Sequence, residues 1–333
     1  MLSLLKAASV LAGAPVDRAV AMACVVTGSD GPTPISRGHS GLNHDGAPLQ
    51  LCVSIDRDGA RYRLLGDPAA DIPDIVHRLK RSLIAAEALL PLSGAQALEP
   101  LVKATLAGLI GDENGFDPAR HPDGVLWLAG PLQGAGLALY VDARNGGRSA
   151  VDRLRAWLAS TVEVTEDSEA LLAAVAAGRV MSAGLEGLAP GYARAKIYWR
   201  MAGAAALAES PIALFADPAF ARTAAEVIGD RDIRLDGLVL NAGLSIPDGR
   251  LVDAKLDICC CPHCVRLEPA EAVLLAHRLA MFHDLPMPDI AALTTAGELA
   301  FIGFGLTRKR EPRLNFYFKP KLGDVDHGSN NRQ

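Results

Sequence analysis

The sequence lacks a long apolar run and an excess of positive charge, and each absence argues against a class of protein. No stretch reaches the roughly 20 uncharged apolar residues that a membrane-spanning helix requires. The formal net charge of -5, from 33 basic and 38 acidic residues, argues against a protein that neutralises a nucleic-acid backbone or an anionic membrane. Lys6 interrupts the apolar start, and no basic segment precedes it, which favours a helix over about residues 1–20 rather than a signal peptide. We therefore expect a cytoplasmic protein with no nucleic-acid or membrane partner.

Cysteines are few and unevenly placed. Four of the 6 lie within residues 259–264, unlike the scattered framework of a disulfide-rich secreted protein. Cys261 and Cys264 bracket a Pro-His dipeptide, and with His277 and His283 they approach zinc-finger spacing. The two histidines, however, point about 120° apart on one predicted helix and would converge poorly on an ion. Buried thiols are the favoured interpretation, and a zinc or thiol-redox protein built on Cys261 and Cys264 is kept as an alternative.

A repeated unit of two short strands followed by a helix organises the chain. Alternating runs rich in Val, Ile, Leu and Tyr occur in pairs, and Ala/Leu-rich segments with helical spacing lie between the pairs. The expected strand pairs are 49–56 with 60–66, 124–130 with 136–143, 181–188 with 193–200, 233–241 with 252–258, and 298–306 with 312–319. The expected helices include 73–91, 148–159, 215–229 and 268–283. With no dividing linker, residues 1–333 are expected to form one domain, with a flexible tail from about residue 321.

The second strands of the last four units repeat at an almost constant interval. Ala138, Lys196, Lys255 and Asn315 are 58, 59 and 60 residues apart, a regularity typical of an internal repeat. Residues two positions further along share the same strand face; they are Tyr140, Tyr198, Asp257 and Tyr317. Ten antiparallel strands favour closure into a barrel, because closure removes exposed edges. We predict an α+β fold: a closed ten-stranded antiparallel barrel of five hairpin-helix units, with the helices outside and these polar side chains in the lumen.

Two strands carry three polar side chains on one face. Arg194, Lys196 and Tyr198 alternate with apolar residues, and residues 313–317 repeat the arrangement. Such convergence suits an anionic ligand. One strand with this pattern could equally belong to a solvent-exposed sheet face. The same polar face recurs at equivalent positions in several units, however, and this favours a location in the lumen.

The segments that carry these residues resemble strands of a known enzyme family. ARAKIYWR (193–200), RLNFYFKP (313–320), LALYVD (137–142) and the hairpin over residues 47–68 are similar to the strands of the αββα, or PT-barrel, aromatic prenyltransferases. The resemblance is to the dimethylallyltryptophan synthases and their smaller cyanobactin-type peptide-modifying relatives. It implies transfer of a dimethylallyl or geranyl group from its diphosphate to an electron-rich acceptor.

The resemblance also implies roles for individual residues. The diphosphate would bind the cationic side chains Arg63, Arg194, Lys196, Lys255 and Arg313, which stabilise its growing negative charge as the C–O bond breaks. The rings of Tyr140, Tyr198 and Tyr317 would shield the allylic cation from water and hydrogen-bond the phosphates.

Three positions depart from the family pattern. Ala138 replaces the usual lysine and Asp257 a common tyrosine, so the pocket is less basic and the shield thinner there. Gln50 stands where the family often has a glutamate that accepts the acceptor's proton, and glutamine cannot act as that base. Gln50 is then expected to orient the acceptor, with His44, Asp45 or the released diphosphate taking the proton.

Several functional choices stay open. The chain is short, which favours a peptide side chain as the acceptor over a small aromatic metabolite or a free amino acid. No DDxxD-like cluster is present, so no cofactor is expected to be required, although Mg²⁺ is retained as an option. The alternative from another class is a non-catalytic barrel that binds an anionic lipid or a phosphorylated metabolite.

Overall fold

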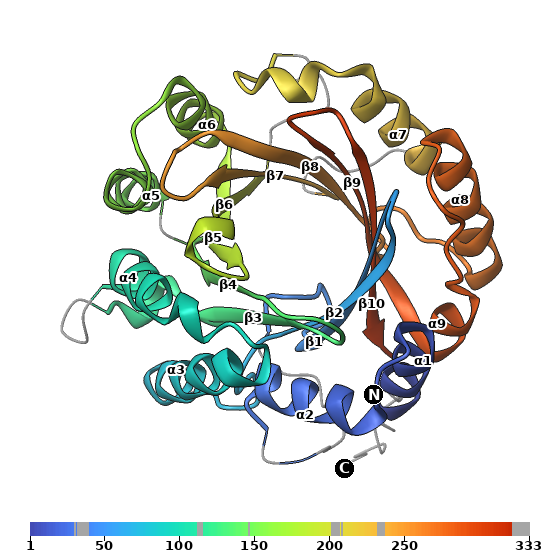
Figure 1. Cartoon of the computed structure of the whole chain (residues 1–333), viewed down its shortest axis with the longest axis horizontal. Coiled ribbons are helices and arrows are strands. Elements are labelled where there is room, and N and C mark those ends of the chain that lie inside the picture. The colour runs from blue at the N-terminus through green and yellow to red at the C-terminus, as the bar shows by residue number, and fades with distance from the viewer. Residues whose placement is uncertain are drawn as a thin grey trace, which may run out of the picture.

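Ten strands form a closed antiparallel barrel inside a ring of helices in the computed structural model (Figure 1). The structure describes residues 1–29, 31, 40–111, 116–145, 147–200, 207, 209–231 and 237–321. The strands are β1 (Leu49–Asp56), β2 (Gly59–Gly66), β3 (Leu126–Pro131), β4 (Leu137–Asp142), β5 (Arg179–Gly187), β6 (Ala193–Arg200), β7 (Leu238–Ser245), β8 (Leu251–Cys259), β9 (Gly297–Thr307) and β10 (Pro312–Pro320).

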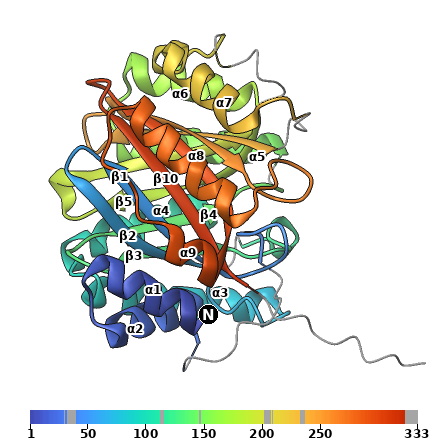
Figure 2. The ribbon, with the colours of Figure 1, turned by 90° about the vertical axis from the view of Figure 1, so that its right-hand side faces the viewer.

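Helices cover the outer surface of the barrel (Figures 1 and 2). In the described part of the chain they are α1 (Leu2–Ala12), α2 (Val16–Thr27), α3 (Ile75–Leu92), α4 (Glu99–Ile110), α5 (Gly147–Thr161), α6 (Glu166–Ala176), α7 (Pro218–Ile228), α8 (Pro269–Phe282) and α9 (Ala291–Ala296). None of the helices in these described ranges is long and apolar enough to cross a membrane.

Each strand pairs with its neighbour in the chain, and β1 pairs with β10 to close the barrel. The predicted closed ten-stranded barrel is therefore confirmed. The strand expected over residues 233–241 instead runs from Leu238 to Ser245, and residues 233–236 of that expectation lie outside the described residues. The predicted tail lies outside them as well, from residue 322 onward.

The amino-terminal segment corrects one expectation. A single helix over about residues 1–20 is wrong, because α1 ends at Ala12 and α2 begins at Val16. Gly13 adopts the left-handed conformation with φ 60° and ends α1, a backbone state that glycine reaches without the steric cost of a side chain. Pro15 then precedes α2. The two helices pack against each other, and α2 also contacts β2 and α3.

The two faces of each strand explain why the barrel has a polar lumen. On β6, Ala195, Ile197 and Trp199 are fully buried in the apolar layer between the barrel and the helices. The alternate residues Arg194 and Lys196 face inward, where they line a cavity. Successive side chains of a strand point to opposite faces, so the outward apolar residues hold the helices and leave the inward positions for polar groups.

Candidate active site

A cavity of about 540 Å³ opens at one end of the barrel. Its volume lies within the roughly 300–1,000 Å³ of small-molecule sites. Residues of the hairpin turns surround its mouth, among them Gln133 and Tyr192, a residue that is 81% exposed. Its walls and floor carry Arg63, Glu186, Arg194, Lys196, Lys255, Arg313 and Asn315. We call this space the central cavity.

Four cationic side chains meet two carboxylates beside the central cavity. Arg194 binds both carboxylates, with its Nη1 2.6 Å from Asp253 Oδ2 and its Nη2 3.1 Å from Glu186 Oε2. Arg63 lies 2.7 Å from Glu186, and Arg313 lies 2.7 Å from Asp253. We call these residues, together with Lys196, the ion cluster. Five strands, β2, β5, β6, β8 and β10, thus contribute to one charged surface.

Lys196 lies between the two carboxylates and forms a long ion pair with each. Its Nζ is 3.5 Å from Glu186 and 3.8 Å from Asp253, and the residue is 1% exposed. Burial lowers the pKa of Lys196 to about 7, with Arg194 and Lys255 adding repulsion and the two carboxylates opposing the shift. Lys196 therefore changes its charge near neutral pH.

The two carboxylates stay ionised. Burial would raise the pKa of Glu186 and Asp253, but the surrounding guanidinium groups, Arg194 foremost, hold both values below the usual range. Burial also acts on Arg194, yet its pKa is raised by these same two partners. The ion cluster is thus a set of fixed charges, apart from the lysine within it.

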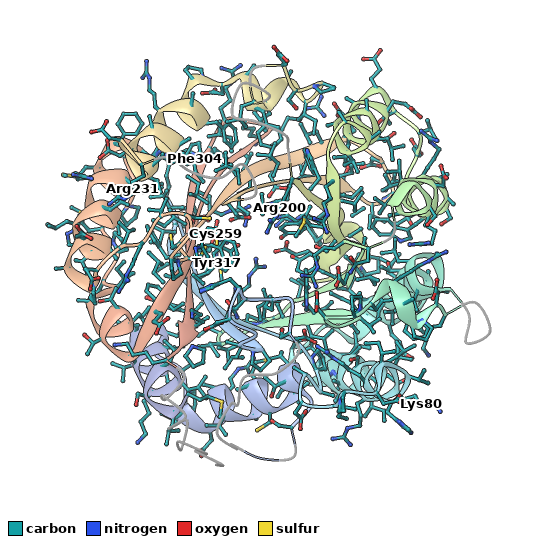
Figure 3. The ribbon with its side chains drawn as sticks, turned by 180° about the vertical axis from the view of Figure 1, so that it is seen from behind. Lys80, Arg200, Arg231, Cys259, Phe304 and Tyr317 are labelled. Atoms are coloured by element: carbon teal, nitrogen blue, oxygen red, sulfur yellow. The ribbon has the colours of Figure 1, made fainter. Side chains whose placement is uncertain are left out.

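Deeper in the lumen, aromatic rings lie against a second charged group. Lys255 lies 2.8 Å from Asp257 and donates a hydrogen bond to the Tyr317 hydroxyl. Its Nζ is also 4.9 Å from the Tyr317 ring centre and 5.9 Å from that of Tyr198. Tyr198 packs edge-to-face on Tyr140, with ring centres 5.1 Å apart. Figure 3 shows Tyr317 inside the barrel and Lys80 on the outer rim. The faces of the Tyr198 and Tyr317 rings thus already lie near ammonium groups.

Glycines on the first strands of the hairpins make room for these long side chains. A Cβ at Gly243 would lie 2.7 Å from Asp253 Oδ1 and 3.1 Å from Arg194 Cδ. One at Gly303 would overlap Asp257 Oδ1 and lie 3.1 Å from the Asn315 Cβ. Both distances are shorter than ordinary carbon contacts. The long polar side chains of β6, β8 and β10 thus occupy the space that side chains on β7 and β9 would fill if these glycines were larger residues.

Gln50, expected to orient the acceptor, and the proton-transfer candidates His44 and Asp45 lie away from the central cavity. Gln50 is 2% exposed and its amide nitrogen donates to Asn43 Oδ1 at 2.7 Å and to the Leu42 carbonyl at 3.3 Å. Asp45 accepts a hydrogen bond from Lys319. His44 is next to this pair, and burial, followed by the Lys319 charge, lowers its pKa.

Segment 40–47 precedes β1 at the end of the barrel opposite the mouth, and we call this the closed end because Leu42, Asn43 and Gln50 are buried there. Leu42 packs there against the lumen-facing Trp127 and Tyr140, and Gln50, His44 and Asp45 belong to this closed end rather than to the lining of the cavity. The structure therefore brings together the predicted cations and tyrosines, but not the predicted base.

Glu186, Asp253 and Asn241 are site residues that sequence reasoning missed. Asp253 stands two residues before Lys255, and side chains two positions apart on a strand share a face. The sequence alone could therefore have indicated that Asp253 faces the lumen. Glu186 pairs in register with Arg194, which only a known strand register reveals. Asn241 donates a hydrogen bond to Asp257 at 2.9 Å.

The cysteine cluster is separate from the two histidines considered with it. His283 shares a hydrogen bond of 2.8 Å with Thr223 and stacks on Phe304, with ring centres 4.2 Å apart. Phe304 belongs to the apolar layer outside the barrel. Neither His277 nor His283 belongs to the group of close metal-ligating atoms found in the described residues. The zinc-finger-like set of Cys261, Cys264 and these histidines is therefore wrong.

Comparison with solved structures identifies the fold. Neither the family models nor the curated proteins searched match this sequence. The 5-dimethylallyl tryptophan synthase of Streptomyces coelicolor is 19% identical, with a TM-score of 0.77 over 97% of this chain and 95% of that one. The 6-dimethylallyltryptophan synthase of Micromonospora olivasterospora is 17% identical, with a TM-score of 0.73 over 96% and 95%.

A third structure, AnaPT from Neosartorya fischeri, is 14% identical, with a TM-score of 0.71 over 95% of this chain and 91% of that one. The three similarities extend over almost the entire chain. They establish that this chain has the fold of the dimethylallyltryptophan synthases, as its strand motifs predicted. At these identities the activity has to be argued from the site itself.

Proposed function

We propose that this protein is a prenyltransferase that moves a dimethylallyl or geranyl group from its diphosphate to an electron-rich acceptor. The observation that carries the proposal is the lumen itself, where the cationic residues of the central cavity adjoin the ring faces of Tyr198 and Tyr317, and Tyr140 packs edge-to-face on Tyr198. Two solved structures of the same fold, the Streptomyces and Micromonospora enzymes, are complexes with DMASPP and tryptophan. An allylic diphosphate has two features that such a lumen can bind: an anionic diphosphate, which fits the cationic side chains, and an allylic group, which becomes a cation beside the aromatic rings.

The charge balance around the cavity fits an anionic ligand. Arg63, Arg194, Lys196, Lys255 and Arg313 carry five positive charges when Lys196 is protonated, and they contact three carboxylates. The surplus of two positive charges is available to a diphosphate. The carboxylates keep the guanidinium groups close together before the ligand arrives, so their mutual repulsion is offset in advance.

The chemistry follows from this arrangement. The C–O bond of the allylic diphosphate breaks, and its electron pair goes to the diphosphate oxygen, which the ion cluster stabilises. The remaining cation lies by the rings of Tyr140, Tyr198 and Tyr317, each face attracting it by about 0.5–2 kcal/mol. An electron pair of the acceptor then forms the new C–C or C–heteroatom bond. We assign the acceptor's proton to the released diphosphate, because the other candidates, His44 and Asp45, lie at the closed end.

A peptide side chain is the acceptor that we favour. The mouth is wide enough to be lined by several hairpin turns, and Tyr192 there offers an exposed aromatic surface to a chain lying across the opening. A small aromatic metabolite or a free amino acid is the second candidate. No requirement for Mg²⁺ is part of the proposal, since protein cations stand where they can contact the phosphates.

Diphosphate release tests the proposal. The purified protein is incubated with geranyl or dimethylallyl diphosphate and a panel of short peptides, indoles, phenols and amino acids, with and without EDTA. Released diphosphate is measured, and products are identified by mass spectrometry. A mass gain of one prenyl group on an acceptor supports it. Saturable binding of both diphosphates without turnover on any peptide, indole, phenol or amino acid contradicts it and supports the non-catalytic anion-binding barrel. Arg194→Gln is the negative control, and Lys103→Gln, an exposed change on α4, is the matched positive control.

A further inference from the structure

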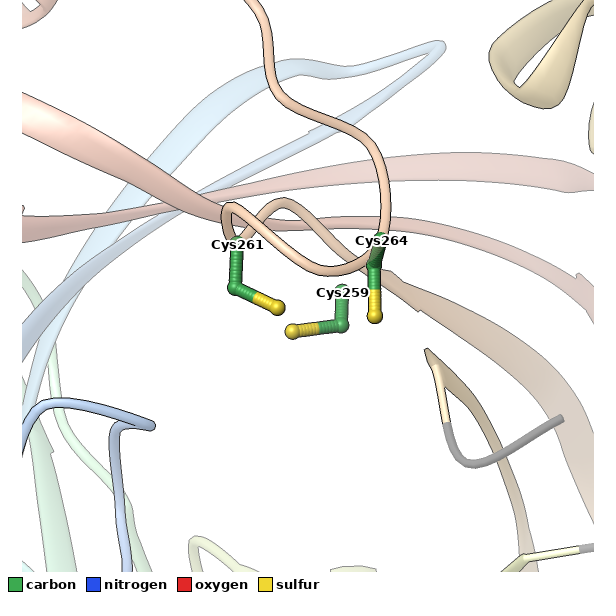
Figure 4. Close-up of side chains that lie close together, drawn as sticks. All are labelled: Cys259, Cys261 and Cys264. Atoms are coloured by element: carbon green, nitrogen blue, oxygen red, sulfur yellow. The ribbon is translucent and has the colours of Figure 1, made fainter. Parts of the chain in front are cut away.

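Three cysteines converge at the end of β8. The Sγ atoms of Cys259, Cys261 and Cys264 all lie within 4.8 Å of one another (Figure 4), and none of the three is in a disulfide. In a tetrahedral zinc site with Zn–S bonds of about 2.3 Å, neighbouring sulfurs are about 3.8 Å apart. Movements of about an ångström therefore bring the three sulfurs to bonding distance of one ion.

The backbone fixes this convergence. Cys260 N–H donates to the Ala300 carbonyl at 2.7 Å and holds the strand end against β9. The chain then turns back, with Cys264 N–H donating to the Cys261 carbonyl at 3.0 Å and Val265 N–H to the Cys259 carbonyl at 3.3 Å. Two cysteines separated by two residues across such a turn is the spacing of many structural zinc sites. The third thiol comes from the strand itself, a ligand that sequence spacing alone did not suggest.

We propose that Cys259, Cys261 and Cys264 bind a zinc ion. Soft thiolates select zinc over the hard cations that carboxylates prefer, and Cys259 and Cys261 are 8% and 6% exposed, so an ion bound there is shielded. Cys264 is the half-buried member, and a water molecule on that side supplies the fourth ligand. Binding converts three thiols into thiolates and releases three protons. A disulfide between Cys261 and Cys264 would leave Cys259 unused and needs an oxidant.

The place of the site gives it a structural role. Cys259 is two residues beyond Asp257 on β8 and shares its inward face. The ion would tie the end of β8 to the loop that leads into α8, near the closed end of the barrel. It would therefore stabilise the strand that carries Asp253, Lys255 and Asp257, independently of whether the barrel transfers prenyl groups.

Metal analysis of the full chain tests this site. Protein purified under reducing conditions is supplied with one equivalent of zinc, and the bound metal is measured after competition with a chromophoric chelator. We expect about one zinc per chain in the wild type and in Cys260→Ser, the matched control whose thiol lies outside the cluster. Cys259→Ser, Cys261→Ser and Cys264→Ser should retain little or none. A wild type that holds no zinc, or a Cys260→Ser protein that loses as much as Cys261→Ser, overturns the proposal.

A second measurement covers variants that fail to fold. Cobalt(II) added to the wild type should give thiolate-to-cobalt charge-transfer absorption with the intensity of three sulfurs and the visible bands of a tetrahedral ion, with three protons released per metal. Octahedral cobalt spectra without charge transfer contradict the site. Peptide mapping that finds a Cys261–Cys264 disulfide in the reduced preparation contradicts it equally.

Discussion

Lys196 gives the sharpest test of the ion cluster, because its charge should control donor binding near neutral pH. The free protein holds this ammonium group buried, with a pKa of about 7. A bound diphosphate replaces lost hydration with negative charge and raises that pKa. At pH 8 about nine-tenths of the free protein carries neutral Lys196. Binding the donor then takes up about 0.9 proton, and the affinity falls up to about tenfold for each pH unit above 7.

Calorimetry with dimethylallyl thiolodiphosphate, between pH 6.5 and 8.5 and in buffers of different ionisation enthalpy, measures both quantities. The phosphate groups themselves are almost fully ionised over most of this range, since their second pKa is about 6. Lys196→Arg keeps a positive charge at all these pH values and should bind with little pH dependence and no proton uptake. Lys103→Arg, on the surface of α4, is the control that should behave as the wild type. A wild-type affinity that does not change with pH, or an equal slope in Lys196→Arg, would refute the reasoning.

Three further changes probe separate parts of the site. Arg194→Gln removes the side chain that contacts both carboxylates and should weaken donor binding by about 30-fold or more; calorimetry showing a change below threefold contradicts this. Tyr198→Phe should keep kcat within about threefold, whereas Tyr198→Leu should lower it by about 2–30-fold and raise hydrolysis of the donor; equal effects in product analysis contradict a cation shield. Gly184→Ala places a methyl group on the Leu139 carbonyl and should lower the unfolding free energy in urea by about 1–3 kcal/mol. Gly191→Ala is the control, because no atom lies within 4 Å of the new methyl group, and it should leave the unfolding free energy unchanged.

Repeats and alternation were enough to predict the barrel. A spacing of 58 to 60 residues and the recurrence of polar residues on the same strand face predict which side of the sheet faces inward. Arg194, Lys196, Tyr198 and Tyr317 are predicted to lie in the lumen on that basis, and they do. Local signals were weaker where a short loop interrupts a continuous apolar pattern. Gly13 and Pro15 divide what the composition suggests is one amino-terminal helix.

The rest of the site depends on register and on contacts distant in sequence. Glu186 and Arg63 are 123 residues apart, and nothing local indicates that they form an ion pair. The sequence predicts that Gln50 orients the acceptor and that His44 or Asp45 takes its proton, yet Asn43 engages Gln50 and Lys319 engages Asp45 at the closed end. A single strand pattern gives the direction of a side chain but not its height along the barrel axis or the groups opposite it.

The glycines beneath the long polar residues restrict how this barrel can diverge. Because the side chains of Arg194 and Asp253 pass across Gly243, and those of Asp257 and Asn315 across Gly303, a larger residue at either glycine displaces a charged or amide group. In homologues we therefore expect these positions to change together. A larger residue should replace one of these glycines only where the polar residue on the adjacent strand has a shorter side chain. A substitution of either glycine would then alter ligand preference as much as the replacement of an arginine in the ion cluster.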